Sequence, residues 1–412
     1  MPSPNVIKPA AGARMPDVVE LMRPGTLSLP ALPPLSLYIH FPWCVRKCPY
    51  CDFNSHEPDP AGIPEATYLG ALSADIEAAL PLIWGRPVVS VFIGGGTPSL
   101  MSAAGVERLL SDVRARLPLE ADCEITMEAN PGTFEAERFA AYRAAGVNRL
   151  SIGVQSFDPS KLVALGRIHD REQALAAIAL VKSVFDNFNL DLMFGLPGQT
   201  LEQSRTDVEA ALAFSPPHLS LYQLTLEPNT VFARYPPDVP DDDTVAEMHE
   251  WIETRTAEAG YRHYEVSAYA HPGRECRHNR NYWRFGDYLG VGAGAHSKIS
   301  FPHRVVRQVR FRQPVSYLER AARGEFLAEH TEVARRDLPF EFMLNALRLA
   351  EGVPAALFTE RTGLPASAIE QAMNKAEQRG LVEADPTRIR PTSLGRRFLT
   401  DLQALFLSPR RT

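Results

Sequence analysis

The chain alternates short apolar runs with amphipathic helical segments between residues 37 and 224, and this alternation limits the folds available to it. The apolar runs are continuous in hydrophobicity, as in strands buried on both faces of a parallel sheet. Predicted strands cover residues 37–41, 88–93, 123–129, 149–156, 189–194 and 218–224, and predicted helices cover residues 64–80, 103–117, 135–145, 171–185 and 201–214. Six strands that alternate with helices predict parallel βα units that close into a barrel or an open barrel.

Glycine and polar residues stand at the ends of these predicted strands. Gly94, Gly95 and Gly96 follow the second strand, Glu128 ends the third and Gln155 ends the fourth. The carboxyl ends of parallel strands are where barrels bind their ligands. The pattern therefore predicts a ligand site at this end of the barrel.

Three of the five cysteines lie in the loop after the first predicted strand, at Cys44, Cys48 and Cys51. Soft thiolate ligands select zinc, copper(I) or an iron–sulfur cluster. Structural zinc usually takes four ligands from paired elements, and no second pair lies nearby. A cubane cluster held by three cysteines keeps one iron open for a further ligand. A zinc knuckle or three unrelated cysteines is the alternative, whereas Cys123, in an apolar strand, is interpreted as a small core residue.

The C-x3-C-x2-C spacing after a first strand, with Tyr50 before the third cysteine, resembles the radical S-adenosylmethionine (SAM) superfamily. The longer string YIHFPWCVRKCPYCDF resembles the oxygen-independent coproporphyrinogen III oxidase group and, within it, the HemW branch. The oxidases carry a fourth cysteine two residues after the third, and Phe53 stands at that position here. The resemblance therefore favours the heme chaperones of the HemW branch over the oxidases.

This resemblance implies an α/β fold with a partial (β/α)6 radical SAM barrel. It implies that the three cysteines hold a [4Fe-4S] cluster whose open iron is chelated by SAM, and it assigns no catalytic side chain. The positions that match the family's SAM contacts are Tyr38, Tyr50, Gly95, Gly96, Thr97, Glu128, Gln155, Arg167 and Asp191. Carboxylates can accept from the SAM ammonium or ribose, and Arg167 can pair with its carboxylate. A tight turn at the glycines and a buried, hydrogen-bonded Asp191 are the alternatives.

A second group of aromatic and titratable residues lies at residues 264–288, in a glycine-flanked segment without a helical stripe, which favours a site in a loop. The string HNRNYW matches the HNxxYW motif that separates the HemW branch from the oxidases. Heme iron is commonly held by His or Cys. The candidate heme residues are His278 as axial ligand, Cys276 as its competitor, and Asn279, Tyr282 and Trp283. The alternative is that His278 and Asn279 only cross-link a loop, and His296 is a further candidate near the barrel mouth.

The chain divides into four expected parts. Residues 1–34 contain eight prolines and are predicted to form a flexible extension. Residues 35–230 form the barrel, and residues 231–330 form a family-specific region that carries the HNxxYW motif. Residues 331–412 resemble a winged helix, with helices at 338–349, 354–362 and 365–379, a hairpin of 380–383 with 388–390, and a last helix at 393–407. The helix that would contact DNA in a winged helix lacks a row of basic residues for phosphate contacts. We therefore expect a packing or partner-binding module and no nucleic-acid binding.

Composition excludes several other functions. The net charge of −6 gives no global basic field, and no run of about 18 apolar residues could span a membrane. Three clustered thiols that must stay free fit a reducing cytoplasm. The family then implies a chaperone that carries heme to acceptor proteins, such as membrane-associated respiratory enzymes, and a homodimer is compatible with it. The alternatives are a coproporphyrinogen III oxidase of porphyrin biosynthesis and a radical SAM enzyme with an unrelated substrate.

Overall fold

The computed structural model describes residues 15–83, 85–133 and 136–407. Its main sheet has 12 strands in the order β12-β11-β10-β9-β1-β2-β3-β4-β5-β6-β8-β7. Six consecutive parallel strands form the middle of this sheet: β1 Leu35–Phe41, β2 Val88–Gly95, β3 Leu119–Ala129, β4 Arg149–Gln155, β5 Phe188–Phe194 and β6 His218–Gln223. All six predicted strands are therefore present, with ends that differ by a few residues.

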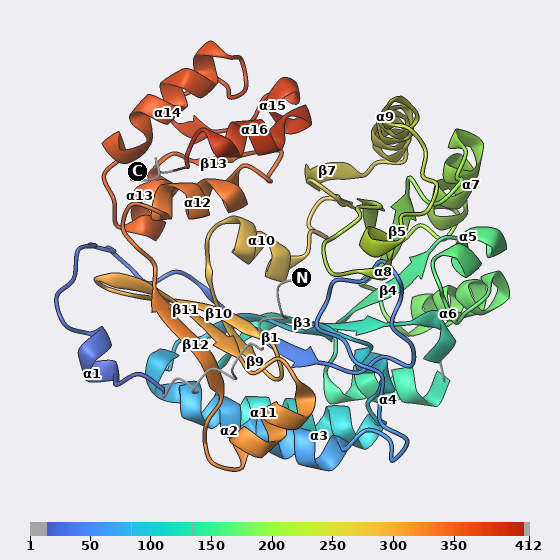
Figure 1. The fold of residues 1–412 in the computed structure, drawn as a ribbon, viewed down its shortest axis with the longest axis horizontal. Helices are drawn as coiled ribbons and strands as arrows, with labels where there is room; N and C mark the ends of the chain where they lie inside the picture. The colour runs from blue at the N-terminus through green and yellow to red at the C-terminus, as the bar shows by residue number, and fades with distance from the viewer. Residues whose placement is uncertain (1–14, 84, 134–135, 408–412) are drawn as a thin grey trace, which may run out of the picture.

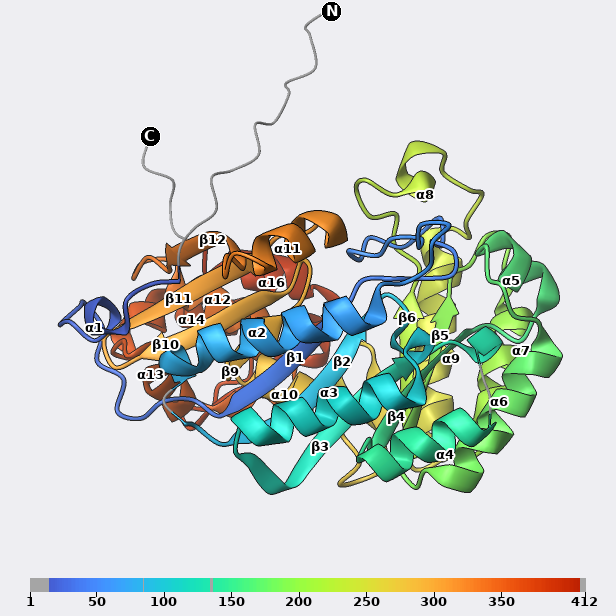
Figure 2. The same ribbon diagram turned by 90° about the horizontal axis from the view of Figure 1, so that it is seen from below.

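The helices between these strands cover the outer face of the sheet. They are α2 Glu65–Ile83, α3 Ala103–Arg116, α4 Ala136–Ala145, α5 Pro159–Ala164, α6 Arg171–Val184 and α7 Leu201–Leu212. Figure 2 shows α2, α3 and α4 side by side along this face. Side-chain caps fix where several of them begin: Asp170 with Gln173, and Thr200 with Gln203, form capping boxes at α6 and α7.

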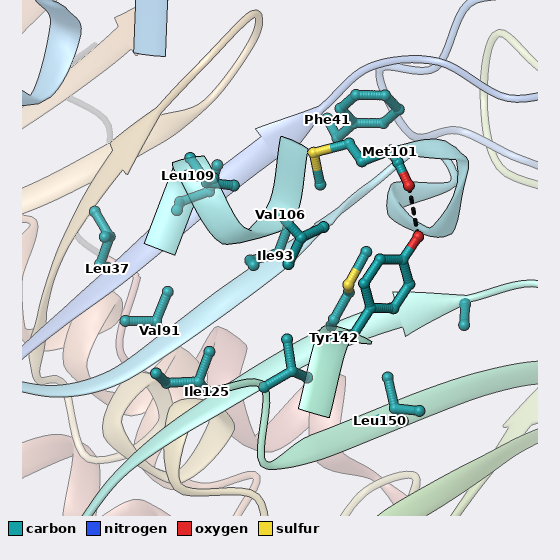
Figure 3. Close-up of a cluster of buried hydrophobic side chains, with 14 of the residues drawn as sticks. Leu37, Phe41, Val91, Ile93, Met101, Val106, Leu109, Ile125, Tyr142 and Leu150 are labelled. Carbon is teal, nitrogen blue, oxygen red and sulfur yellow. Dashed lines mark hydrogen bonds between the residues drawn. The ribbon is translucent and has the colours of Figure 1, made fainter. Parts of the chain in front are cut away.

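The main hydrophobic core lies between the strands and these helices. Figure 3 shows Leu37, Val91 and Ile125 of adjacent strands facing Val106 and Leu109 of α3. Because every second strand residue enters this layer, the intervening residues face the inside of the open barrel. That inner face carries the polar side chains described below.

The region at residues 231–330 widens the sheet at both edges, which the sequence did not predict. After α8 Val231–Arg234 and α9 Asp242–Glu258, strands β7 Arg262–Glu265 and β8 Ala268–Ala270 add to β6. Strands β9 Asp287–Val291, β10 His296–Phe301, β11 Arg304–Arg310 and β12 Leu327–Glu332 add to β1, with α11 Pro314–Ala321 before the last. Between these two groups, α10 Arg277–Trp283 crosses the inner face of the barrel.

The expected flexible extension is wrong for residues 15–34, whereas residues 1–14 lie outside the described residues. This segment contains α1 Val18–Leu21 and buries Leu21, Leu27 and Leu29. The amides of Leu27 and Leu29 donate to His303 and Pro302 carbonyls. The prolines interrupt any helical or strand periodicity in the sequence. They do not prevent an extended segment from being held in place by backbone hydrogen bonds and three buried leucines.

The small C-terminal domain lies over α10 (Figure 1), in a second hydrophobic core that also includes Leu27, Tyr264 and Phe285. It contains α12 Leu338–Ala346, α13 Ala356–Thr362, α14 Ser367–Gln378, α15 Ser393–Arg397 and α16 Leu399–Ala404. The two arms of the predicted hairpin pair through an antiparallel bridge between Val382 and Pro391 and through backbone hydrogen bonds from Glu383 to Arg390 and from Thr392 to Leu381. In addition, β14 Arg388–Ile389 pairs with β13 Val353–Pro354. The predicted last helix is interrupted at Phe398. None of the described helices has the length and hydropathy needed to cross a membrane.

Candidate functional site

The cysteine loop connects β1 to α2 at the carboxyl end of the barrel. Its base is closed by the Cys44 amide, which donates to the His56 carbonyl at 2.9 Å, and by a bridge between Trp43 and His56. Across the loop, Lys47 Nζ donates to the Phe53 carbonyl at 3.0 Å. The loop therefore holds its shape through backbone and lysine contacts and leaves its three thiols free.

Each thiol has at least one polar neighbour. Thr97 Oγ1 donates to Cys44 Sγ at 3.5 Å, an Arg167 guanidinium nitrogen donates to Cys48 Sγ at 3.6 Å, and Ser55 Oγ lies 3.8 Å from Cys51 Sγ. These donors favour thiolates. Burial nevertheless raises the pKa of Cys44 and Cys51, so a bound metal must displace protons from these thiols.

The donor set fits an iron–sulfur cluster better than a single ion. In the part of the chain that the structure describes, no three His, Cys, Asp or Glu side chains converge on one ion position. A structural zinc ion requires such convergence, whereas a cubane takes each cysteine on a different iron. Three free thiols around one pocket match the second arrangement.

The thiols open into a pocket of about 380 Å³ at the carboxyl ends of the strands. All the residues expected to contact the cluster or SAM, except Tyr38, line this pocket: Cys44, Cys48, Tyr50, Cys51, Gly95, Gly96, Thr97, Glu128, Gln155, Arg167 and Asp191. Small-ligand pockets usually measure roughly 300–1,000 Å³. The pocket volume therefore falls within the range of sites that hold one small ligand.

Gly95 and Gly96, at the end of β2, occupy positions where a side chain would clash with neighbouring atoms. Gly95 has φ +114°, and a Cβ there would lie 2.4 Å from His40 Cε1. A Cβ on Gly96 would lie 2.5 Å from the Trp43 carbonyl oxygen. The missing side chains thus let these residues pack closely against His40 and the Trp43 backbone, and both glycines line the pocket.

Two carboxyl groups lie on the floor of the pocket. Glu128 accepts from the Gly95 amide at 3.0 Å, and Asp191 accepts from Ser151 and Asn189 at 2.9 and 2.8 Å. Burial and the nearby Asp191 raise the pKa of Glu128 to about 7, and burial also raises the pKa of Asp191. A cationic ligand group would favour ionisation of both.

Gln155 and Arg167 complete the floor. Gln155 has φ 69°, in the left-handed region that a non-glycine residue rarely adopts. Such strain is concentrated at ligand sites. Besides its contact with Cys48, Arg167 donates to the Gly153 carbonyl at 2.6 Å, so its guanidinium bridges the cysteine loop and β4.

Tyr38 lies deeper in the barrel than the pocket. Its hydroxyl is 2.9 Å from His40 Nδ1, and its ring stacks on Phe92 with centroids 6.3 Å apart. The structure therefore places Tyr38 one layer below the expected SAM contacts.

The five heme candidates are separated from the pocket, and the predicted loop is a helix. His278 is 2% exposed and lies against the inner face of the sheet, with Nδ1 3.0 Å from Ser90 Oγ. Burial lowers the pKa of His278 to about 3, and its Nε2 has no hydrogen-bond partner among the described residues. Cys276 is fully buried, and its thiol donates to Glu124 at 3.6 Å. Neither side chain can reach a heme iron while α10 stays in place.

The remaining three candidates also belong to α10. Tyr282 packs on His278 and Tyr288, and Trp283 stacks under the Arg348 guanidinium of the C-terminal domain. Asn279 precedes both on the same helix. No helical stripe was visible because α10 is contacted by the barrel on one side and by the C-terminal domain on the other. His296 is exposed at the start of β10 and does not line the pocket.

Several pocket residues were missed from the sequence. Met193, Tyr222 and Leu224 line its outer part, and Phe53 stands at its mouth with 59% of its surface exposed. The alternation along β5 and β6 was the available signal, because Met193 and Tyr222 share a face with Asp191.

Comparison with known proteins agrees with this architecture. Residues 38–210 match the radical SAM superfamily and residues 333–398 match the HemN C-terminal domain. The solved structure of the radical SAM enzyme coproporphyrinogen III oxidase (HemN) from Escherichia coli superposes with a TM-score of 0.78 at 23% identity, covering 97% of this chain and 99% of that one, which shows the shared fold.

Sequence relatives give the family. The chain is 49% identical to the heme chaperone HemW of Escherichia coli K12, over 92% of this chain and 99% of the relative. It is 48% identical to the heme chaperone HemW of Haemophilus influenzae, over 92% of this chain and 100% of the relative. The chain belongs to the HemW family of heme chaperones, which joins a radical SAM barrel to a HemN-type C-terminal domain.

Proposed function

We propose that this chain binds heme, delivers it to acceptor proteins, and holds a [4Fe-4S] cluster and SAM in the pocket at the carboxyl ends of its strands. The observation that carries the proposal is the 49% identity to a heme chaperone over 99% of that protein's length. Membrane-associated respiratory heme proteins are the expected acceptors. A reducing cytoplasm is the expected location, because the three thiols must remain available.

The pocket residues have distinct parts in this proposal. The cysteines bind the cluster through three thiolates, and Arg167 and Thr97 donate to two of them. Glu128 and Asp191 supply negative charge for the SAM ammonium, while the Gly95–Gly96 backbone fixes the ligand's position. When bound, the cluster and SAM supply one-electron chemistry that protein side chains lack. The side chains themselves bind, orient and exclude water.

His278 is the proposed axial ligand of heme. Its Nε2 is buried without a hydrogen-bond partner among the residues that the structure describes, which is costly unless the group is used elsewhere. Burial keeps the ring neutral, which is the form that binds iron. Because His278 faces the sheet, heme binding requires α10 to leave the inner face of the barrel.

The alternative activity is decarboxylation of coproporphyrinogen III. Its support is the fold shared with the HemN structure. Phe53 occupies the position at which the oxidases carry a fourth cysteine, and its exposed ring offers no ligand. We therefore place this activity second.

The test is a heme titration of the full chain followed in the Soret region. Wild type should bind heme saturably and His278→Ala should lose affinity by about tenfold or more and shift the Soret maximum. His169→Ala is a matched control, because His169 is also buried, with one bonded ring nitrogen and one that has no partner in the described part of the chain. An unchanged spectrum and affinity in His278→Ala would remove His278 as ligand.

The same preparation, reconstituted anaerobically with iron and sulfide, should not convert coproporphyrinogen III to protoporphyrinogen. Conversion that depends on SAM, together with no heme binding, would replace the chaperone by the oxidase.

A further inference from the structure

The side-chain amide of Asn281 starts a buried series of hydrogen bonds that reaches the ring of His278. Its nitrogen donates to the Asp287 carbonyl at 2.9 Å and contacts the Pro34 carbonyl at 3.5 Å. Carbonyl oxygens only accept, so these two contacts fix which end of the amide is the nitrogen. The same nitrogen therefore donates its other hydrogen to Ser36 Oγ, at 2.9 Å.

Two serine hydroxyls continue this series to the histidine. Ser36 Oγ lies 2.8 Å from Ser90 Oγ, and Ser90 Oγ lies 3.0 Å from His278 Nδ1. Both serines are fully buried, and apart from the amide on Ser36 neither hydroxyl has a further partner in the described part of the chain. We call Asn281, Ser36 and Ser90 the Asn281 network.

The hydrogen bonds of the Asn281 network all run in one direction. Ser36 already accepts from the amide, so among the described residues the acceptor left for its own hydrogen is Ser90 Oγ. The Ser90 hydrogen is then donated to His278 Nδ1. An imidazole nitrogen that accepts carries no hydrogen, so the neutral ring holds its hydrogen on Nε2. The opposite tautomer would leave the hydroxyl hydrogen of Ser36 buried without an acceptor, which is costly.

The other surroundings of the His278 ring hold it in place without selecting a tautomer. Nε2 has no hydrogen-bond partner among the described residues, so this nitrogen is unsatisfied in both tautomers. The rings of Phe92 and Tyr282 lie 5.1 and 5.0 Å from the His278 ring. Because His278 is only 2% exposed, its ring cannot turn away from Ser90 while α10 stays in place.

We propose that the residues of the Asn281 network are positioning residues that keep the hydrogen of His278 on Nε2, so that His278 does not bind iron while α10 lies against the sheet. This inference rests on the proposed function, in which His278 is the axial ligand. Iron binds an imidazole nitrogen that carries no hydrogen, whereas Nε2 holds the hydrogen and Nδ1 accepts from Ser90. Heme must therefore compete with the network, which lowers the apparent heme affinity.

The tautomer can be measured by nitrogen NMR of the heme-free full chain with isotope-labelled histidine, in which His278→Ala identifies the signals of His278. Wild type should show a protonated Nε2 and an unprotonated Nδ1. Asn281→Asp should move the hydrogen to Nδ1, because a carboxyl oxygen accepts from Ser36 and so reverses both serine bonds. Ser90→Ala removes the donor to Nδ1, and both tautomers should then be populated.

Heme affinity is measured on the same variants by titration in the Soret region. Ser90→Ala should bind heme about 2- to 10-fold more tightly than wild type, since the hydrogen bond that opposes binding is absent. Ser156→Ala is the matched control, because Ser156 is also fully buried and donates to Asp207 of α7 at 2.6 Å, outside the network. It should leave both the tautomer and the heme affinity unchanged.

The outcomes separate this inference from the proposed function. A hydrogen on Nδ1 in wild type, or on Nε2 in a folded Asn281→Asp variant, would overturn the direction of the network. An unchanged or lower heme affinity in Ser90→Ala would refute its restraint on iron binding, and this test does not depend on the folding of Asn281→Asp. Each of these results would leave the chaperone function standing, whereas absence of heme binding in wild type would overturn the proposed function whatever the tautomer.

Discussion

At the residue scale, the carboxyl group of Glu128 is the clearest case in which the pocket changes the chemistry of a side chain. Burial raises its pKa from 4.5 to about 7, more than the hydrogen bond from Gly95 lowers it. The folded protein therefore binds a proton at Glu128 that the unfolded chain has lost. Its contribution to stability is present below about pH 4.5 and is lost as the pH rises towards 7.

Glu128→Gln should abolish this loss of stability with rising pH. Relative to wild type, the free energy of unfolding of the variant should increase between about pH 5 and about pH 8 by up to about 3 kcal/mol, less to the extent that pocket water solvates the carboxylate. Urea unfolding of the SAM-free protein at the two pH values measures it, with Glu107→Gln on the exposed face of α3 as the control. A difference that does not depend on pH would show that Glu128 is not protonated in the pocket.

At the element scale, α10 illustrates how a short helix is fixed by contacts outside itself. Its seven residues begin at Arg277, and the side chain of its N-cap residue, Cys276, makes no hydrogen bond to the first turn of the helix. Asn281 holds it to the barrel, because the side-chain amide donates to Ser36 Oγ and to the Asp287 carbonyl, both at 2.9 Å. Gly286 lies so close that a Cβ there would overlap the Asn281 side chain.

Asn281→Ala should therefore destabilise the protein by about 1–3 kcal/mol, because it leaves buried partners unsatisfied. Asn279→Ala provides a control on the same helix, since no side-chain hydrogen bond of Asn279 occurs among the described residues. Its effect should stay within about 0.5 kcal/mol. Equal effects of the two variants in urea unfolding would contradict a specific anchoring role for Asn281.

At the scale of the whole molecule, a buried ion pair joins the first helix of the barrel to the added edge of the sheet. Asp75 of α2 and Arg310 of β11 are 3.2 Å apart, and both side chains are fully buried. Asp75 also accepts from the Tyr317 hydroxyl at 2.9 Å and from the Gly292 amide at 3.1 Å. Residues more than 200 positions apart in sequence are thereby held in one unit.

Asp75→Ala should cost about 3–5 kcal/mol, because it leaves Arg310 buried without its counter-charge. Asp112→Ala, which removes the partially exposed partner of Arg108 and Arg116, should cost less than about 1 kcal/mol. Denaturant unfolding of the full chain compares the two. Similar values for both variants would mean that the buried pair does not stabilise the assembly of these elements.

Much of the fold and of the pocket could be predicted from the sequence, for a local reason. The strands β1 to β6 lie in chain order, so alternation of apolar runs and helical stripes was enough to place them. Cys44, Cys48 and Cys51 are neighbours in one loop, and Glu128 and Gln155 stand at strand ends, which parallel strands bring to the same edge.

Only the tertiary structure decided the remaining features, because they depend on contacts between distant segments. β9 pairs with β1 across about 250 residues, with Leu35 opposite Asp287, and such pairing leaves no local signal in a five-residue strand. His278 carries the residue type expected of a heme ligand, but its burial against Ser90 depends on how α10 packs between two domains. The residues thus determined which groups could bind iron, and the packing of distant elements determined which of them face the pocket.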